Sequence, residues 1–307
     1  MSADASASKI GKMLSCASCG IAGGDDVKLK DCSACKLVKY CGIECQRRHR
    51  PKHKNECKRR AAELRDEILF KQPDSSDFGD CPICCLPLSI DFTKSSLYSC
   101  CSKLICSGCD YANYKREIEE KLQSTCPFCR HPIPTSNEEG EKNLLKRVAA
   151  NDPVAMTRMG VFRRKAGDHS GAVEYFTKAA TFGNYAGAHY ELSLMYYDGH
   201  GVEKDEKKYL HHLEFAAIGG NVLGRYNLGC AEGRIGRLDR AVKHFIIAAN
   251  MGDDRSLENL KFAYRKKLVS KEDFAAVLRA HKAAVDATKS PQREEAEQWY
   301  ARDGQIG

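Results

Sequence analysis

The sequence lacks any run of about 18 consecutive apolar residues, the length that a membrane-crossing helix needs. We therefore expect no membrane-spanning segment and no membrane partner. The N-terminus, from Met1 to Ala5, is polar and acidic and has no apolar signal-peptide core. We expect a cytoplasmic or nuclear protein. In such a reducing compartment disulfide bonds are rare, and paired cysteines more often bind metal.

Signatures of an independent active site are also missing. The sequence contains no glycine-rich phosphate-binding loop, no methyltransferase motif and no His-Glu-x-x-His hydrolase signature. Cysteine is scarce after residue 129, where only Cys230 occurs. We expect Cys230 to be a small packed side chain on a helix, and we expect no enzyme with a nucleophile of its own.

Cysteine is abundant before residue 130, in the segment that holds sixteen of the seventeen cysteines. Five C-x2-C pairs each place two thiolates on one short turn, a spacing typical of structural zinc sites. The pairs are Cys16 and Cys19, Cys32 and Cys35, Cys81 and Cys84, Cys106 and Cys109, and Cys126 and Cys129. The further candidate ligands are Cys41 and Cys45, His53 and Cys57, and the doublet Cys100 and Cys101. Two groups of eight ligands predict four structural Zn²⁺ ions.

The formal net charge of +8 overstates the positive charge of the metal-bound protein. Zinc ligands bind as thiolates, so fifteen thiolates remove fifteen charges, four Zn²⁺ return eight, and about +1 remains. One local run is basic: Arg47, Arg48, Arg50, Lys52, Lys54, Lys58, Arg59 and Arg60. It could attract nucleic acid or serve as a nuclear address. Because no aromatic stacking residues are interleaved, we favour a solvated helix face and do not expect a nucleic-acid partner.

The first group of ligands spans residues 16–57. The i,i+4 spacing of Cys41 with Cys45, and of His53 with Cys57, would present each pair on one face of a helix. Forty-two residues cannot bury enough apolar surface to fold unaided, so metal binding should supply the folding free energy. Spacing alone leaves open which pairs share a metal.

The stretch 40–46, with Pro51-Lys52-His53-Lys54 and Cys57 after it, resembles a MYND zinc finger. The resemblance implies two interleaved sites: zinc one at Cys16, Cys19, Cys41 and Cys45, and zinc two at Cys32, Cys35, His53 and Cys57. It also implies binding of short proline-containing peptides from partner proteins. This chain has Arg50 where the family usually has a tryptophan that helps to form the peptide groove.

The second group of ligands spans residues 81–130. The motifs Cys81-Pro82-Ile83-Cys84, Cys101 to Cys106, and Cys126-Pro127-Phe128-Cys129-Arg130 resemble a RING finger of the all-cysteine kind. The resemblance implies zinc three at Cys81, Cys84, Cys106 and Cys109, and zinc four at Cys100, Cys101, Cys126 and Cys129. Cys85 is left over, either as a free thiol in a loop or as a ligand that exchanges register with Cys84.

RING fingers bind a ubiquitin-charged E2 enzyme and hold its thioester ready for attack by a substrate lysine, which lowers the entropic part of the barrier. Carried over by resemblance, Ile83 and Pro127 would pack on the E2, and Arg130 would hydrogen-bond both E2 and ubiquitin. Each residue also has a purely structural interpretation. Lys103 stands near the usual histidine ligand, and residues 111–118 predict a helix without the usual tryptophan.

A repeat follows the polar boundary at 135–140. The pattern Ala-Ala-x-x-Gly-Asn/Asp ends at Asn184, Asn221 and Asp253, and its glycines are 37 and 32 residues apart. Such periods are typical of helix–turn–helix solenoids. We expect each glycine to end a second helix in the left-handed conformation and the following Asn or Asp to cap the next helix. These motifs resemble Sel1-type repeats, which implies a surface that recruits protein partners.

The predicted fold is therefore two small zinc-stabilised cross-brace modules followed by an all-α helix-turn-helix solenoid of Sel1-like repeats. The expected domains are a disordered N-terminus (1–15), a MYND-type finger (16–57), a helical then flexible linker (58–80), a RING-type finger (81–130), a linker (131–150), repeats at 151–183, 184–220 and 221–252 (together 151–252), and a C-terminal helical cap (253–307). The leading functional hypothesis is a RING-type E3 ubiquitin ligase that positions an E2–ubiquitin conjugate while the MYND finger and solenoid recruit protein partners. The alternative is a non-catalytic zinc-binding scaffold.

Overall fold

The computed structural model describes residues 15–303. The chain divides into two compact units, with the boundary between Lys71 and Gln72 in the sequence, and each unit is described by itself. The disorder expected for residues 1–15 concerns a segment that, apart from Ser15, lies outside the described residues. Within the described part of the chain, no helix has the length and apolar character needed to cross a membrane.

The first unit holds the first zinc module (residues 16–57) and one long helix. Strands β1 (Lys30–Asp31) and β2 (Lys39–Tyr40) pair antiparallel, with Lys30 opposite Tyr40. Helix α1 (Ile43–Leu69) follows directly and continues through the segment whose composition is helical. The buried cluster of this unit consists of Cys16, Cys32, Cys35 and Tyr40. Sulfur atoms thus occupy the place of an aliphatic core.

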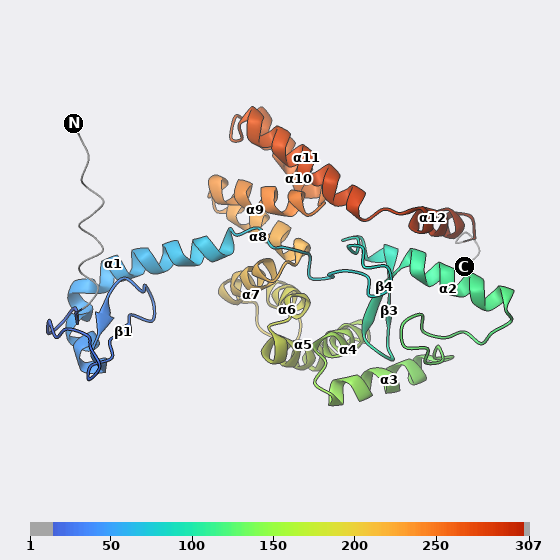
Figure 1. The fold of residues 1–307 in the computed structure, drawn as a ribbon, viewed down its shortest axis with the longest axis horizontal. Helices are drawn as coiled ribbons and strands as arrows, with labels where there is room; N and C mark the ends of the chain where they lie inside the picture. Colours follow the sequence, from blue (N-terminus) through green and yellow to red (C-terminus); the bar gives the residue numbers. More distant parts are fainter. Residues whose placement is uncertain (1–14, 304–307) are drawn as a thin grey trace. The chain divides into compact units, whose positions relative to one another are not determined.

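The second unit begins with the second zinc module (residues 81–130). Its elements and those that follow are η1 (Phe92–Lys94), β3 (Ser95–Tyr98), β4 (Lys103–Cys106), α2 (Ser107–Glu119), α3 (Asn137–Ala149), α4 (Pro153–Lys165), α5 (His169–Gly183), α6 (Ala186–Asp198), α7 (Glu206–Ile218), α8 (Val222–Arg234), α9 (Leu238–Asn250), α10 (Asp254–Arg265), α11 (Lys271–Ala287) and α12 (Pro291–Asp303). Strands β3 and β4 form an antiparallel hairpin in which Ser95 lies opposite Cys106, and α2 follows it (Figure 1).

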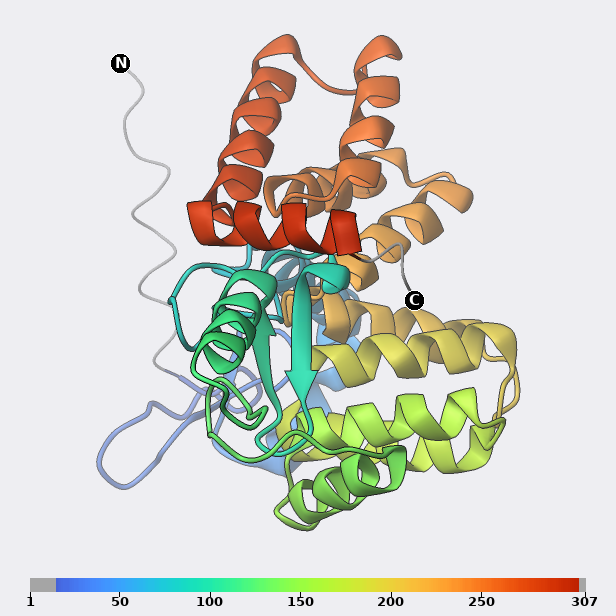
Figure 2. The same ribbon diagram turned by 90° about the vertical axis from the view of Figure 1, so that its right-hand side faces the viewer.

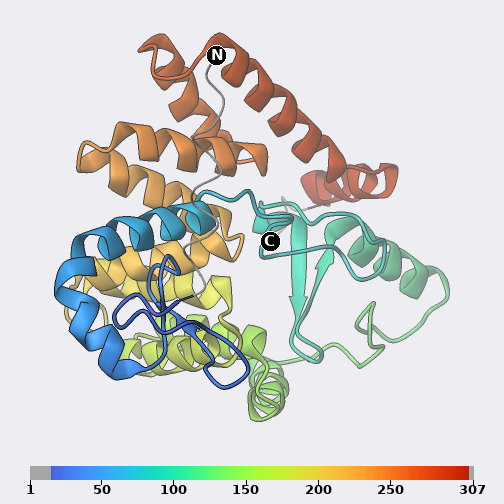
Figure 3. The same ribbon diagram turned by 60° about the vertical axis from the view of Figure 1, so that its left-hand side comes forward.

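The solenoid is a stack of antiparallel helix pairs, α4 with α5, α6 with α7, and α8 with α9 (Figure 3). Ala179, Ala216 and Ala248 are completely buried, so the small side chains allow neighbouring helices to approach closely. The predicted all-helical solenoid is confirmed.

The repeat ends differ in one detail from the expectation. Gly220 and Gly252 adopt left-handed φ values of 85° and 93°, and Asn221 and Asp253 then cap α8 and α10. In the first repeat the left-handed residue is Asn184 itself, with φ 47°, and α6 has no side-chain cap. Asparagine tolerates this conformation, so it can replace glycine there at the expense of the next cap.

Two segments expected as linkers take part in the fold. The 72–80 segment lies along the repeats, where the Asn221 side chain donates a 2.7 Å hydrogen bond to Asp77. A Cβ on Gly220 would come within 2.6 Å of the carbonyl oxygen of Ser75, so glycine allows this close approach. Within 131–150, α3 forms because Ser136 caps it by accepting a hydrogen bond from the backbone N–H of Glu139.

The C-terminal region does more than cover the end of the solenoid. Helices α10 and α11 continue the stack beyond α9. Helix α12 then turns back and packs along α2 of the second zinc module (Figures 1 and 2). Within the range 253–307 that the sequence assigns to a helical cap, α10 and α11 therefore pack on the repeats, whereas α12 packs on α2.

Close packing of α4 on α5 can be tested at Gly160. A Cβ at this position would lie 2.4 Å from the ring of Phe176, which is fully buried. We expect Gly160→Ala to lower the free energy of unfolding by about 1–3 kcal/mol, because overpacking outweighs the better helix propensity of alanine. Urea unfolding followed by circular dichroism measures this change.

Gly233→Ala provides the matched control, because its Cβ would meet only Ala241 at an ordinary 3.8 Å. This variant should be as stable as the wild type or up to about 1 kcal/mol more stable. Equal stability of the two variants would contradict the packing argument.

Candidate metal centres

The structure brings the candidate ligands together in four clusters. Within each cluster the Sγ atoms, or three Sγ atoms and one imidazole nitrogen, all lie within 4.8 Å of one another. The clusters are Cys16, Cys19, Cys41 and Cys45; Cys32, Cys35, His53 and Cys57; Cys81, Cys84, Cys106 and Cys109; and Cys100, Cys101, Cys126 and Cys129. These are the same four sets that the MYND and RING resemblances imply.

The spacing of the sulfur atoms fits a tetrahedral Zn²⁺. Cys19 and Cys41 Sγ are 3.6 Å apart, and Cys84 and Cys106 Sγ are 3.7 Å apart. A tetrahedron with zinc–sulfur bonds of about 2.3 Å has edges of about 3.8 Å, whereas a disulfide would need about 2.05 Å. None of the seventeen cysteines forms a disulfide bond. The donor atoms therefore suit four structural Zn²⁺ ions.

Four C-x2-C turns share one backbone geometry. The residue after the second cysteine is left-handed in each turn, with φ of 77° at Gly20, 55° at Lys36, 57° at Cys85 and 60° at Arg130. Its N–H donates back to the carbonyl of the first cysteine at 2.8–2.9 Å, as Cys85 does to Cys81. We call each of these C-x2-C turns a knuckle. In the knuckle that begins at Cys81, Cys85 is the exposed left-handed residue, and Cys84 is the residue that belongs to the metal cluster.

Local hydrogen bonds lower the pKa of one cysteine in each of these turns. A side-chain hydrogen bond from Cys106 lowers the pKa of Cys81 to about 4, although burial opposes the shift. Burial also raises the pKa of Cys16, but hydrogen bonds from nearby backbone N–H groups outweigh it and lower that pKa to about 6. The bond between Cys81 and Cys106 in turn raises the pKa of Cys106, so this pair favours one thiolate, and zinc, which binds deprotonated ligands, must displace the proton of the other thiol.

The three residues singled out for an E2 contact lie in different surroundings. Ile83 is 42% exposed, and Arg130 is exposed, with its Nη1 atom donating a 2.7 Å hydrogen bond to the Asn113 side chain on α2. Pro127 is buried, whereas its neighbour Phe128 is 44% exposed. Sequence reasoning missed both Asn113 and Phe128, because a side-chain partner or an exposed ring has no signature in cysteine spacing.

A buried carboxylate joins α2 to the last knuckle. Glu117 Oε1 accepts hydrogen bonds from the backbone N–H of Thr125 at 2.9 Å and from its hydroxyl at 2.8 Å. Asn113 Nδ2 donates to the same oxygen and to the carbonyl of Thr125. These bonds anchor α2 beside Cys126, so they fix the turn that carries Arg130 relative to α2.

Helix α12 supplies two contacts that the cysteine pattern does not reveal. Arg293 reaches the first knuckle of the second zinc module, where its Nη2 atom is 3.3 Å from Cys84 Sγ. Trp299, the only tryptophan in the sequence, lies between Tyr111 and Tyr114 of α2, with ring centroids 5.2 Å from each. The module whose own helix lacks a tryptophan thus receives one from the other end of the chain.

The fold and the metal centres define a zinc-finger protein with a helical repeat domain. The family model of the MYND finger matches residues 16–57, and that of the Sel1 repeat matches 153–184, 186–221 and 222–253. The chain therefore carries a MYND finger and three Sel1 repeats, and this combination of modules is that of a protein-interaction scaffold. No curated protein matches the chain.

The solved structures that resemble the chain include the following two. One is a Sel1 repeat protein from Oxalobacter formigenes, with 19% identity, a TM-score of 0.43, and coverage of 65% of this chain and 87% of the other. The second is c5321, a protective antigen of uropathogenic Escherichia coli with an SLR fold, with 19% identity, a TM-score of 0.41, and coverage of 66% and 41%.

Zinc stoichiometry tests the assignment of Cys84 and Cys85. We expect about four equivalents of zinc in the purified protein, measured by elemental analysis. Cys84→Ser should reduce the value to about three, because it removes one of four ligands. Cys85→Ser changes a thiol one position away and should leave about four. Loss of zinc on changing Cys85 would mean that the register is shifted by one residue.

Proposed function

We propose that this protein is a RING-type E3 ubiquitin ligase, in which the second zinc module binds an E2–ubiquitin conjugate. The observation that carries the proposal is the interleaving of two four-cysteine clusters along the chain. The first and third ligand pairs meet in one cluster, and the second and fourth pairs meet in the other. In this cross-brace, one cluster joins the first knuckle to the start of α2, and the other joins the turn of the β3–β4 hairpin to the last knuckle.

The surface of this module offers the groups that such a contact requires. Ile83 and Phe128 present exposed apolar side chains from the first and last knuckles. Arg130 is held by Asn113 through one N–H, and its exposed guanidinium has further donors for a partner's carbonyl groups. Pro127 supports the contact from beneath by shaping the knuckle. The mechanism needs no nucleophile from this chain, because the substrate lysine attacks the E2 thioester that the module holds in place.

The MYND finger and the Sel1 repeats would bring the substrate to the conjugate. Within the second unit, the 72–80 segment and α12 both connect the second zinc module to the helical region. A substrate bound on the solenoid would therefore be held at a defined distance from the E2. This arrangement raises the effective concentration of the attacking lysine.

Autoubiquitination with a panel of E2 enzymes tests the proposal. We expect chains with at least one E2, and we expect Ile83→Ala and Arg130→Ala each to reduce the rate by roughly tenfold, which corresponds to about 1.4 kcal/mol of contact energy. Ile118→Ala is the matched control, because Ile118 is 58% exposed and lies one turn beyond Tyr114 on the α12 side of α2.

Absence of ubiquitin chains with every E2, in protein that retains four zinc equivalents, would reject ligase activity and leave the non-catalytic scaffold. Equal losses in the Ile83 and Ile118 variants would instead show that the contact does not use the proposed surface.

A further inference from the structure

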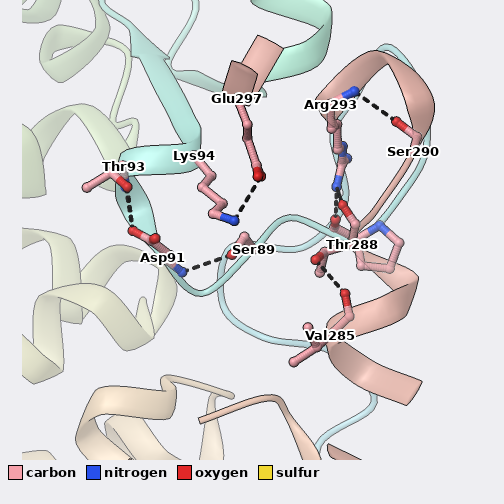
Figure 4. A network of polar contacts seen from close by, with 10 residues as sticks. Ser89, Asp91, Thr93, Lys94, Val285, Thr288, Ser290, Arg293 and Glu297 are labelled. Atoms are coloured by element: carbon pink, nitrogen blue, oxygen red, sulfur yellow. Dashed lines mark hydrogen bonds and ion pairs between the residues drawn. The ribbon is translucent and has the colours of Figure 1, made fainter. Parts of the chain in front are cut away.

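Arg293 on α12 is built into the third metal cluster. Arg293 is 5% exposed, and Figure 4 shows its side chain extending from the start of α12 toward Thr288. Its Nη1 atom donates to the carbonyl oxygens of Pro87 and Thr288, both at 2.7 Å. Its Nη2 atom donates to the carbonyl of Leu86 at 3.2 Å and to Cys84 Sγ at 3.3 Å. The guanidinium therefore touches a zinc ligand and the turn that follows it.

The charges at this place are complementary. Four thiolates around one Zn²⁺ carry a net charge of about −2 in a buried site. A buried guanidinium is costly unless it is paired and hydrogen-bonded. Arg293 also has a buried Nε atom without a hydrogen-bond partner among the described residues, which adds to that cost. The attraction between the negative zinc cluster and the Arg293 guanidinium therefore offsets the free-energy cost of burying both charges.

A second feature shows that the knuckle is shaped to receive α12. Gly108 lies between the ligands Cys106 and Cys109, and a Cβ on it would come within 2.9 Å of the backbone nitrogen of Arg293. Only glycine allows the helix to approach the metal cluster this closely. The ion pairs Lys94–Glu297 and Lys115–Glu295 flank the contact, but they are about half exposed and contribute little.

We infer that zinc binding at Cys81, Cys84, Cys106 and Cys109 is thermodynamically coupled to docking of α12, with Arg293 as the counter-charge. The metal centre is then assembled from residues more than 200 positions apart. Coupling is reciprocal, so α12 strengthens zinc retention and zinc strengthens the docking of α12 by the same factor. This inference does not depend on ligase activity.

Zinc release from the full-length protein tests the coupling. A chelating dye reports the rate at which each zinc leaves, and the emission of Trp299, the only tryptophan, reports docking of α12 on Tyr111 and Tyr114. Arg293→Met keeps the length of the side chain but removes its charge. We expect one of the four zinc ions to leave roughly tenfold faster, in line with other residues that support metal ligands, and the emission to move to longer wavelength.

Trp299→Ala is the second variant, because Trp299 supports α12 and belongs to no cysteine cluster. Coupling predicts faster release of one zinc here too. Arg302→Met is the control, since within residues 15–303 the side chain of this exposed residue of α12 donates only to the Gln298 carbonyl. Unchanged release in both the Arg293 and Trp299 variants would overturn the inference, and so would equal acceleration in the Arg302 variant.

A different surface points to the chemistry of a binding partner. A groove of about 480 Å³ lies along α1 in the first zinc module. Ile43, Arg47, Arg50, Lys54 and Lys58 follow one another at i+3 or i+4 and so line the groove from one face of the helix. No carboxylate is among its described lining residues. Arg47 pairs with Glu44, whereas the three other cations form no ion pair within residues 15–303.

We propose that this groove binds an acidic peptide segment. The row of cations would receive carboxylates, and Ile43, which is 68% exposed, would receive an apolar side chain. The aromatic residue of the groove, Tyr40, is only 3% exposed and cannot stack on a base, which favours a peptide over nucleic acid. The proposal deepens the partner recruitment suggested above, and it is tested by binding alone, without ubiquitin transfer.

Fluorescence anisotropy with three labelled probes tests this surface. The probes are a leucine-containing decapeptide rich in Asp and Glu, the same peptide with Asn and Gln, and a single-stranded DNA oligonucleotide. We expect the acidic peptide to bind at least tenfold more tightly than its amide counterpart at low salt, with affinity falling as salt rises. Arg50→Glu should weaken binding roughly tenfold.

Lys52→Glu is the control, because it makes the same charge change on α1 at an exposed position outside the groove. Similar binding of both peptides would overturn the proposal. Tighter binding of the DNA, or equal effects of the Arg50 and Lys52 substitutions, would also overturn it, because either result indicates general electrostatic attraction.

Discussion

Coordination of metal by sulfur takes the place of an apolar core in the first 130 residues. The buried clusters of both zinc modules consist mainly of cysteines, with only a few other side chains such as Tyr40, Leu88 and Ile105. The repeated left-handed turn residue sets each pair of thiolates on one side of a knuckle. Such turns bury too little surface to persist alone, so each module depends on the ion that joins two knuckles distant in sequence.

The second unit combines this metal-dependent module with a solenoid held together by different forces. The repeats rely on alanine contacts between helices and on side-chain caps at the helix starts, both of which are local. The module is joined to them at two places, by the 72–80 segment beside Gly220 and by α12 along α2. Two separated connections restrict rotation far more than one linker would, so the metal module and the repeats have a fixed relative orientation.

The ligand sets and the repeats could be predicted because their signals are local. Two cysteines on one turn, or a glycine at the end of each helix pair, are visible within a few residues. The docking of α12 depends on Arg293 and Cys84, which are 209 residues apart, and no periodicity encodes it. The contact of the 72–80 segment with the repeats has no sequence signal for a related reason: its Pro, Ser and Asp content is the same in a free linker and in a loop that a repeat surface holds in place.

The exposed surface of the second zinc module is relevant to the question of whether this module has a role beyond structural support. Single exposed apolar residues are ordinary on protein surfaces, so Ile83 by itself indicates nothing. Here, however, Ile83 and Phe128 come from the two knuckles that the cross-brace connects, and Arg130 is oriented by Asn113 from the helix between them. Glu117 is buried and hydrogen-bonded, whereas Ile83, Phe128 and Arg130 remain exposed. An exposed surface that three separate elements of the fold position in this way is consistent with the partner contact proposed above.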